Sequence, residues 1–270
     1  MKLTSPKDVT ELLASLKFRP SKTLGQNFLV DGNILRIMLD TAEIGPEDQV
    51  LEIGPGLGVL TEGLLARAKR VVAIELDKRL YAYLRERFAG EKNLELIPGD
   101  ALDADFNALM KSGINKVASN LPYGAGSRIL VELFESNPAP VRMSVTVQHE
   151  VADRLAAQPG TKKYGLLSVL AQLDYEVEIR KIVAASCFYP APQVKSAIVS
   201  LRRRPVPREL RDRAVFKDLV KKAFSQRRKQ IGTILRGANF ENAGINPASR
   251  PEELYVEDWC RLADEVTSNR

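Results

Sequence analysis

The chain has 270 residues, of which 44% are hydrophobic, and this is enough to form one large domain with a small second one. No apolar run approaches the roughly 18 residues of a transmembrane helix, and the first residues lack the apolar core of a signal peptide. The two cysteines, Cys187 and Cys260, fit no disulfide or metal-ligand pattern. We therefore expect a reduced, cytoplasmic protein with no membrane association and no metal.

The net charge of +6 is concentrated near the C-terminal end. Residues 1–200 carry 24 basic and 24 acidic side chains, whereas residues 201–270 carry 16 and 10. Between Arg202 and Lys229 there are twelve basic and three acidic residues. Such an excess attracts polyanions, and we expect Arg227 and Arg228 to contact RNA phosphates. The alternative is a solvated basic helix face.

A lead-in of about 30 residues comes first in the chain. It contains a short amphipathic segment, which ends near Pro20, and a polar loop over residues 21–29. Helical periodicity follows over residues 34–39.

Strands and helices alternate after the lead-in. We expect strands at 49–53, 70–75, 93–97, 117–120, 141–148, 174–182 and 197–202, and helices at 60–66, 80–88 and 127–134. Strands separated by helices predict a parallel sheet that helices cover. Residues 202–207 are typical of a linker, and a helical tail follows in which Phe216, Leu219, Val220 and Ala223 share one face.

A glycine-rich turn over residues 52–58 joins the first of these strands to a helix. Gly54 and Gly56 allow the backbone to turn sharply and to approach a ligand closely. In dinucleotide-binding folds such a turn faces a pyrophosphate, but Glu52 would repel a phosphate. A carboxylate there favours a ligand that carries a positive group and no phosphate, and S-adenosylmethionine is such a ligand.

Two further acids follow the next two strands. Glu75 ends the second strand, 21 residues after Gly54, where an acid pairs with ribose hydroxyls. Asp100 follows the third strand, where it can accept a hydrogen bond from the adenine amino group. The carboxyl ends of parallel strands meet at one crevice, so these acids and the glycine-rich turn predict one cofactor site. The alternative is a tight turn beside two solvated acids.

The turn Asn120-Leu121-Pro122-Tyr123 follows the fourth strand. Adenine N6 is a poor nucleophile because its lone pair is delocalised into the ring. Acceptors for the N6 hydrogens localise that lone pair, and the Asn120 side chain and the Leu121 carbonyl suit this role, with Pro122 restricting the residue before it. Tyr123 can stack on a flipped base, which contributes about 1–3 kcal/mol. The alternative is an Asn-capped turn with a packed tyrosine.

Together these motifs resemble the small-subunit ribosomal RNA adenine dimethyltransferase family. The resemblance rests on the stretches 24–29, 52–58, 99–101, 120–123, 148–155, 159–165, 188–196 and 224–229. It implies an α/β fold with a Rossmann-like class I methyltransferase domain over 31–204. A lead-in over 1–30 would close over the cofactor, and a small helical domain over 208–270 would bind RNA.

The resemblance also implies the reaction and the residues that perform it. S-adenosylmethionine would dimethylate N6 of two adjacent adenines in a hairpin loop near the 3′ end of small-subunit rRNA, within an assembling 30S particle and without an obligate protein partner. The implied cofactor contacts are Asn27, Leu29, Gly54, Gly56, Glu75, Asp100 and Asn120. The implied catalytic residues are Asn120, Leu121, Pro122, Tyr123 and Phe188, with the target adenine between Tyr123 and Phe188.

The chain departs from the family pattern at two places. Residues 124–127 are small where larger residues are usual, which predicts a more flexible turn. His149 replaces the usual lysine, and we expect a structural or RNA-contact role for it.

Three alternatives remain open: a large-subunit rRNA methyltransferase of the resistance type, a small-subunit assembly factor with secondary catalysis, and a nicotinamide-dependent dehydrogenase. The stretches 159–165 and 188–196 disfavour the first, and the intact Glu75, Asp100 and Asn120 argue against lost catalysis. Glu52 and the spacing of the glycines disfavour the third.

Overall fold

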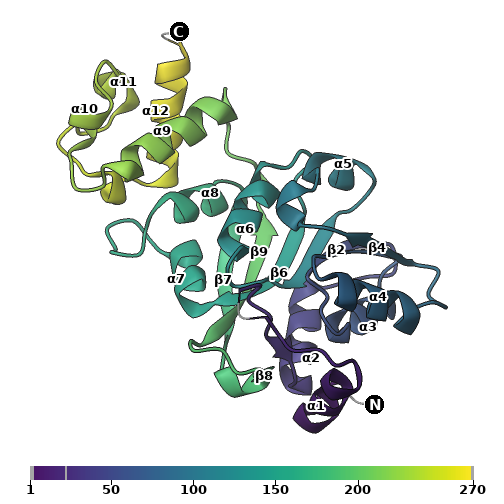
Figure 1. Ribbon diagram of the computed structural model, residues 1–270. Coiled ribbons are helices and arrows are strands. Elements are labelled where there is room, and N and C mark those ends of the chain that lie inside the picture. The colour runs from purple at the N-terminus through teal and green to yellow at the C-terminus, as the bar shows by residue number, and fades with distance from the viewer. Residues whose placement is uncertain (1–2, 22, 269–270) are drawn as a thin grey trace. The chain divides into compact units, whose positions relative to one another are not determined.

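The computed structural model describes residues 3–21 and 23–268, which form two compact units (Figure 1). The first unit contains the chain up to Ala152 together with Glu178–Arg202, and the second contains Asp153–Val177 and the chain from Arg203 onward. Residues 1–2 and 22 of the expected lead-in, and the last two residues of the expected C-terminal domain, lie outside the described residues.

The division into units differs from the one expected from sequence, because the lead-in groups with the first unit and residues 203–204 group with the second. Residues 153–177, expected within the methyltransferase domain, also group with the C-terminal helices. The reason is a set of contacts that sequence periodicity does not reveal. Arg213 binds the carboxylate of Asp174 at 2.8 Å, and the buried Tyr164 hydroxyl donates to the carbonyl of Leu254 at 2.9 Å.

A seven-stranded sheet with the order β4-β3-β2-β5-β6-β9-β7 organises the fold. Its strands are β2 (Gln49–Ile53), β3 (Arg70–Glu75), β4 (Leu94–Pro98), β5 (Lys116–Asn120), β6 (Arg142–Gln148), β7 (Tyr175–Val183) and β9 (Ser196–Arg203). The strands β2 to β6 pair in parallel, whereas β9 runs antiparallel to β6. The expected α/β class is confirmed, but the expectation of a wholly parallel sheet was wrong at β9. The strand β9 begins beside the carboxyl end of β6, where Ser196 pairs with Gln148. It runs antiparallel because the connection over residues 184–195 contains no α-helical crossover, which a parallel strand would need.

Helices alternate with the strands in the first part of the chain. They are α1 (Pro6–Ser15), α2 (Gly32–Ala42), α3 (Val59–Leu65), α4 (Lys78–Arg87), α5 (Phe106–Lys111), α6 (Gly126–Glu135) and α7 (His149–Ala156). Asp31, Asp77 and Asp105 begin three of them by accepting hydrogen bonds from backbone N–H groups of the first turn. In α2 the apolar spacing buries Ile34 and Met38 against the sheet.

A second, two-stranded sheet was not expected from the sequence. The strands β1 (Phe28–Leu29) and β8 (Phe188–Tyr189) pair antiparallel, with Phe28 opposite Tyr189 and Leu29 opposite Phe188. Strands of two residues are too short to show a period in the sequence. This pairing fastens the lead-in to the stretch that precedes β9.

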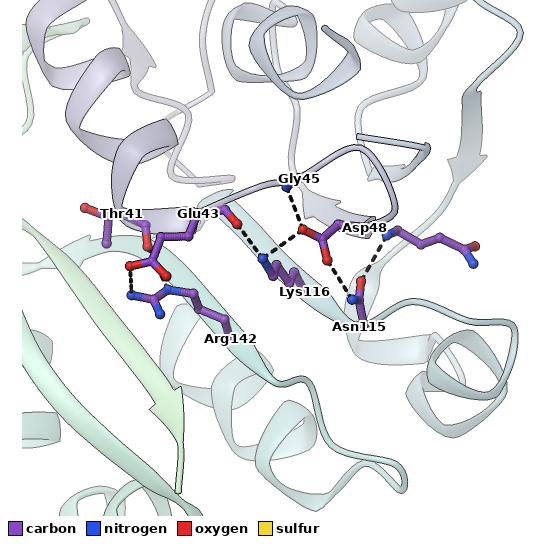
Figure 2. Close-up of polar contacts among 8 residues, drawn as sticks. Thr41, Glu43, Gly45, Asp48, Asn115, Lys116 and Arg142 are labelled. Atoms are coloured by element: carbon purple, nitrogen blue, oxygen red, sulfur yellow. Dashed lines mark hydrogen bonds and ion pairs between the residues drawn. The ribbon is translucent and has the colours of Figure 1, made fainter. Parts of the chain in front are cut away.

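The amino ends of β2, β5 and β6 are held by a network of charged and polar side chains (Figure 2). The Asp48 carboxylate binds Lys116 at 2.8 Å and accepts hydrogen bonds from Asn115 and from the Gly45 N–H, each at 2.7 Å. Burial opposes the charge on Asp48, but the hydrogen bonds with Lys116, Gly45 and Asn115 outweigh it and lower the pKa of Asp48. At this edge, then, Asp48 and Lys116 neutralise each other.

The second unit consists mainly of helices. They are α8 (Leu166–Asp174), α9 (Arg213–Ser225), α10 (Ile231–Ile234), α11 (Phe240–Ala243) and α12 (Val256–Ser268). In α9 the face expected from sequence, including Phe216 and Val220, is buried, and the fully buried Trp259 of α12 contributes to the same unit. Within the described ranges, no helix combines the length and the apolar character needed to cross a membrane.

Candidate functional site

The carboxyl ends of β2, β3 and β5 border a cavity of about 270 Å³ in the first unit. Ten of the eleven candidate residues line it: Asn27, Leu29, Gly54, Gly56, Glu75, Asp100, Asn120, Leu121, Pro122 and Tyr123. Their convergence follows from the parallel sheet, because strand ends that are distant in sequence meet at one edge. The described residues of the wall include three acids, Glu52, Glu75 and Asp100, and no lysine, arginine or histidine.

The glycine-rich turn is fixed by backbone geometry and by β3. Gly54 and Gly56 have φ angles of +67° and +60°, a region that side chains rarely adopt. A Cβ atom at Gly56 would lie 3.0 Å from the Phe28 ring, so glycine also allows the lead-in to approach. The Gly54 N–H donates to the carbonyl of Ile74 at 2.9 Å. The turn is therefore held in one conformation at the cavity wall.

Glu75 connects this turn to the end of β3. Its carboxyl group is buried and accepts hydrogen bonds from the Gly56 N–H at 3.0 Å and from the Asp77 N–H at 2.9 Å. Burial raises the pKa of Glu75, and these two hydrogen bonds offset only part of that effect. Glu75 thus has a fixed position from which its carboxyl oxygens can accept further hydrogen bonds.

Glu52 is a buried acid at the cavity wall, with 1% of its surface exposed. Its Oε2 atom has no hydrogen-bond partner among the residues that the structure describes. Burial raises the pKa of Glu52 to about 8; interaction with the Thr61 side chain offsets part of this effect, and repulsion from Glu75 adds to it. The sequence suggested a carboxylate at this position, whereas the raised pKa favours the protonated acid in the absence of a ligand. A cation close to Glu52 would lower this pKa and stabilise the carboxylate.

Asp100 forms the wall beyond β4. Its Oδ1 atom accepts a hydrogen bond from the Leu102 N–H at 2.9 Å and begins the 3₁₀ turn Ala101–Asp103. Asp100 is thus the N-cap residue of this turn, and the hydrogen bond orients its carboxylate.

The lead-in loop forms the wall opposite the strand ends. The Gln26 side chain accepts from the Ser21 N–H at 2.7 Å and donates to Asp77 at 3.3 Å, which holds the loop against the start of α4. Asn27 Nδ2 donates to the Gly25 carbonyl at 3.1 Å. A Cβ atom at Gly25 would lie 3.1 Å from the Tyr123 nitrogen, so the loop packs closely on the turn after β5. Sequence reasoning assigned no role to Gln26 although it lies in the motif 24–29.

The side chain of Asn120 is oriented by the lead-in. Its Nδ2 atom donates to the Asn27 carbonyl at 3.0 Å. Its Oδ1 atom is buried and has no hydrogen-bond donor within the described part of the chain. The Gly126 N–H donates to the Pro122 carbonyl at 2.8 Å and closes the turn that follows. A buried amide oxygen without a donor is costly, and a donor supplied by a ligand would remove that cost.

The two aromatic candidates lie in different environments. Tyr123 lines the cavity, and its hydroxyl forms a hydrogen bond with Ser196; burial raises the pKa of this phenol. Phe188 is 3% exposed, packs in the hydrophobic cluster that contains Leu29 and Met38, and is not among the described residues of the cavity wall. The placement of a base between Tyr123 and Phe188 stays a prediction. Burial of a phenylalanine ring contributes about 1.5–3 kcal/mol, which explains its position.

The two departures from the family pattern lie beside the cavity and after β6, respectively. Gly124 and Ala125 line the cavity, and α6 begins at Gly126. His149 begins α7, and its N–H donates to the Lys195 carbonyl at 2.9 Å. This contact connects α7 to the stretch 188–196.

The chain matches a family model described as ribosomal RNA adenine dimethylase over residues 17–268. It is similar to proteins named ribosomal RNA small subunit methyltransferase A from Clostridium botulinum and Moorella thermoacetica. The first is 39% identical over 94% of this chain and 96% of the relative, and the second is 42% identical over 90% and 91%.

Two solved structures share the fold over most of their length. A dimethyladenosine transferase from Plasmodium falciparum superposes with a TM-score of 0.75 at 27% identity, covering 89% of this chain and 97% of that chain. The 23S rRNA methyltransferase ErmE superposes with a TM-score of 0.69 at 29% identity, covering 89% and 100%.

Proposed function

Because the chain belongs to the ribosomal RNA adenine dimethylase family, we propose that it transfers methyl groups from S-adenosylmethionine to N6 of two adjacent adenines in small-subunit rRNA. The observation that carries this proposal is Asn120, whose amide is oriented by Asn27 and whose buried Oδ1 atom has no donor among the described residues. Adenine N6 is a hydrogen-bond donor that fits this position. The relatives named for the small subunit support the choice of substrate, and the proposed site of action is the cytoplasm.

The acidic cavity fits S-adenosylmethionine in three respects. Gly54 and Gly56 adopt positive φ angles and form part of the cavity wall, as glycines do in other cofactor turns. The unpaired oxygen of Glu52 suits a positive group, and Glu75 and Asp100 suit the ribose hydroxyls and the adenine amino group. When it is bound, the cofactor supplies an electrophilic methyl group. We propose that the lead-in, residues 1–30, closes over it, because Asn27 and Leu29 already line the cavity.

The residues of the turn 120–123 would prepare the nucleophile. Hydrogen bonds from N6 to Asn120 Oδ1 and to the Leu121 carbonyl localise the nitrogen lone pair. Bound S-adenosylmethionine would supply the methyl group, with formation of the N6–C bond balanced by loss of the S–C bond, and one N6 proton would pass to water for each methyl added. A neutral amide does not retain that proton, so Asn120 acts as an acceptor of a hydrogen bond and not as a base.

Tyr123 is the proposed stacking surface, because its ring lines the cavity and its hydroxyl is held by Ser196. A second stacking contact from Phe188 requires this ring to leave its hydrophobic cluster. Phe188→Leu tests that movement, because leucine keeps most of the packing but removes the ring. If Phe188 stacks, the yield of dimethyladenine relative to monomethyladenine falls in this variant. An unchanged ratio would leave Tyr123 as the only aromatic contact of the two.

The structural similarity to ErmE keeps a large-subunit rRNA substrate as the second candidate. Labelled S-adenosylmethionine would be incubated with small subunits that lack the modification, with large subunits and with naked rRNA, followed by nucleoside analysis. We expect dimethyladenine in the small-subunit reaction alone, and the naked rRNA sample shows whether an assembling 30S particle is required. Label in the large subunit would replace the proposal with the second candidate. Binding without label would favour an assembly factor.

A further inference from the structure

The second unit contains an open pocket of about 480 Å³ between the loop 159–165 and the C-terminal end of α9. Its described wall is strongly basic and contains no acidic side chain. The cationic residues of the wall are Arg154, Lys162, Lys163, Lys221 and Arg227. The remaining residues are Tyr164, Gly165, Leu166, Phe224 and Ser225.

The loop that carries Lys162 and Lys163 has a fixed conformation. Gly160 has a φ angle of +80°, and its N–H donates to the Glu252 carbonyl at 2.7 Å. The Thr161 hydroxyl donates to the Gln158 carbonyl at 2.7 Å, which closes the turn. The two lysines therefore project from a backbone that is ordered before any ligand binds, which lowers the entropic cost of binding.

Aromatic side chains connect this loop to α9. The Tyr164 ring meets the edge of the Phe224 ring at 6.1 Å between centroids, and Phe224 packs against Trp259 at 5.7 Å. Tyr164 and Trp259 are fully buried. This packing fixes Lys221, which lies three residues before Phe224 on α9, relative to the loop.

The five cations of the pocket divide into two groups. Lys163 binds Asp153 at 2.6 Å, and Arg227 binds Glu252 and donates to the Thr161 carbonyl at 3.1 Å. Arg154, Lys162 and Lys221 are exposed, and none of them forms an ion pair within the described ranges. The charges of Lys163 and Arg227 are neutralised by their acidic partners. The pocket therefore keeps three positive charges without an acidic partner in the described ranges, those of Arg154, Lys162 and Lys221.

We propose that this pocket binds phosphodiester groups of the rRNA backbone through Arg154, Lys162 and Lys221; the identity of the RNA rests on the proposed function. Three cations around one concave surface suit the closely spaced negative charges of a nucleic acid. The start of α8 at Leu166 also lies in the wall and adds the partial positive charge of a helix N-terminus.

The same geometry changes the expectation for Arg227. The basic stretch 224–229 suggested that Arg227 contacts RNA, but its guanidinium holds the loop 159–165 to Glu252. Arg227 therefore shapes the pocket, and its contact with RNA phosphate stays a prediction. Its replacement should lower thermal stability, whereas replacement of Lys221 should not.

The test compares two variants that lose the same charge. The first is Arg154→Gln/Lys162→Gln/Lys221→Gln, and the control is Lys78→Gln/Lys92→Gln/Lys111→Gln, whose three lysines are exposed and lie in the first unit. The association constant for a small-subunit rRNA transcript is measured as a function of salt concentration. Each phosphate contact contributes a slope of about −0.7 to −0.9 in log–log form, so we expect the pocket variant to be flatter by roughly 2 and the control to be unchanged.

Several outcomes would overturn this proposal. One is an unchanged slope in the pocket variant, and another is an equal change in both variants, which would indicate a diffuse charge effect. Titration with inorganic phosphate separates a free-anion site from an RNA site: phosphate binding at the pocket with an unchanged RNA slope would also reject the proposal. Lys221→Gln against its neighbour Lys222→Gln repeats the comparison within one helix.

The binding assay also separates this proposal from the proposed catalytic function. The salt slope requires no methyl transfer, and binding of S-adenosylmethionine to the variants reports whether the first unit is intact. Wild-type protein that binds the transcript through the pocket but never methylates it would reject the catalytic proposal alone. Wild-type protein that methylates small-subunit rRNA with an unchanged slope in the pocket variant would reject only the pocket.

Discussion

The two ends of the central sheet differ in how completely their polar groups are satisfied. At the amino end, Asp48 and Lys116 neutralise each other, and Asn115 and Gly45 complete the hydrogen bonds of the carboxylate (Figure 2). At the carboxyl end, Glu52 Oε2 and Asn120 Oδ1 are buried without partners among the described residues. An end that is internally satisfied stabilises the fold, whereas an end with unpaired acceptors is arranged for a ligand. Variants at the two ends should therefore affect different properties.

The two pockets differ in a parallel way. The charged side chains described in the wall of the first are acidic, and those of the second are basic. A positively charged cofactor suits the first, and a phosphate backbone suits the second. The acidic cavity of the first unit thus suits the proposed cofactor, and the basic pocket of the second unit suits the proposed RNA substrate.

The largest expected effect is that of Asn120→Ala at the carboxyl end. Removal of a preorganised group at a reacting centre typically costs on the order of 10²–10³-fold in rate, and we expect such a loss of methyl transfer. Binding of S-adenosylmethionine should weaken only moderately. Single-turnover transfer and calorimetric cofactor binding provide the two measurements. Full activity in this variant would exclude the hydrogen-bonding role of Asn120.

Lys116→Met at the amino end should reduce stability without altering transfer at a permissive temperature. We expect a loss of about 2 kcal/mol in the free energy of unfolding, between the values for an exposed and a buried ion pair, since both side chains keep 14% exposure. Chemical denaturation gives this value. Asp48→Asn/Lys116→Met should recover part of the loss, because no uncompensated charge remains. A parallel loss of activity and stability would contradict the division between the two ends.

The same ion pair predicts a pH dependence of stability. The pKa of Asp48 is lower in the folded protein than its ordinary value, so its contribution is present above about pH 4 and is lost as the pH falls through the folded value. Asp48→Asn should flatten the acid limb of a plot of unfolding free energy against pH. An acid limb identical to that of the wild type would assign acid sensitivity to other groups.

At the carboxyl end, Glu52 predicts that cofactor affinity depends on pH. The pKa of Glu52 is about 8 without a ligand, and a cation favours the carboxylate, so binding below pH 8 releases a proton. Affinity should rise with pH up to about 8, at most roughly tenfold per unit. The Glu52→Gln variant should bind S-adenosylmethionine more weakly, and its affinity should lack the part of the pH dependence that comes from Glu52. Because the cofactor titrates identically in both experiments, the difference between variant and wild type reports Glu52 alone. Equal pH profiles in both proteins would contradict the coupling.

The smallest expected effect concerns the link between Tyr123 and Ser196. Tyr123→Phe keeps the stacking ring but loses the hydroxyl contact, so we expect a loss of about 1 kcal/mol in transition-state stabilisation, or roughly fivefold in kcat/KM. Ser196→Ala should have a similar effect, and the double variant should add little. Tyr123→Ala should be much more damaging. Additive single effects would show that the two hydroxyls act separately.

The sequence by itself determined the features that depend on local order. The bounds of β2 and β3 agree with those expected, because buried parallel strands form short apolar runs that end at turn residues. The resemblance to a family with a Rossmann-like class I methyltransferase fold is confirmed. Ten of the eleven candidate residues line one cavity because each motif follows a strand, and parallel strands end at one edge.

Only the tertiary structure decided which of these side chains are buried, paired or charged. The pairing of β1 with β8 places Phe188 in a hydrophobic cluster, and two-residue strands leave no pattern in the sequence. Burial and the neighbouring Glu75 raise the pKa of Glu52, and Arg227 binds Glu252, which lies 25 residues away in the sequence. Protonation and charge pairing depend on distances in space, which the order of residues does not contain.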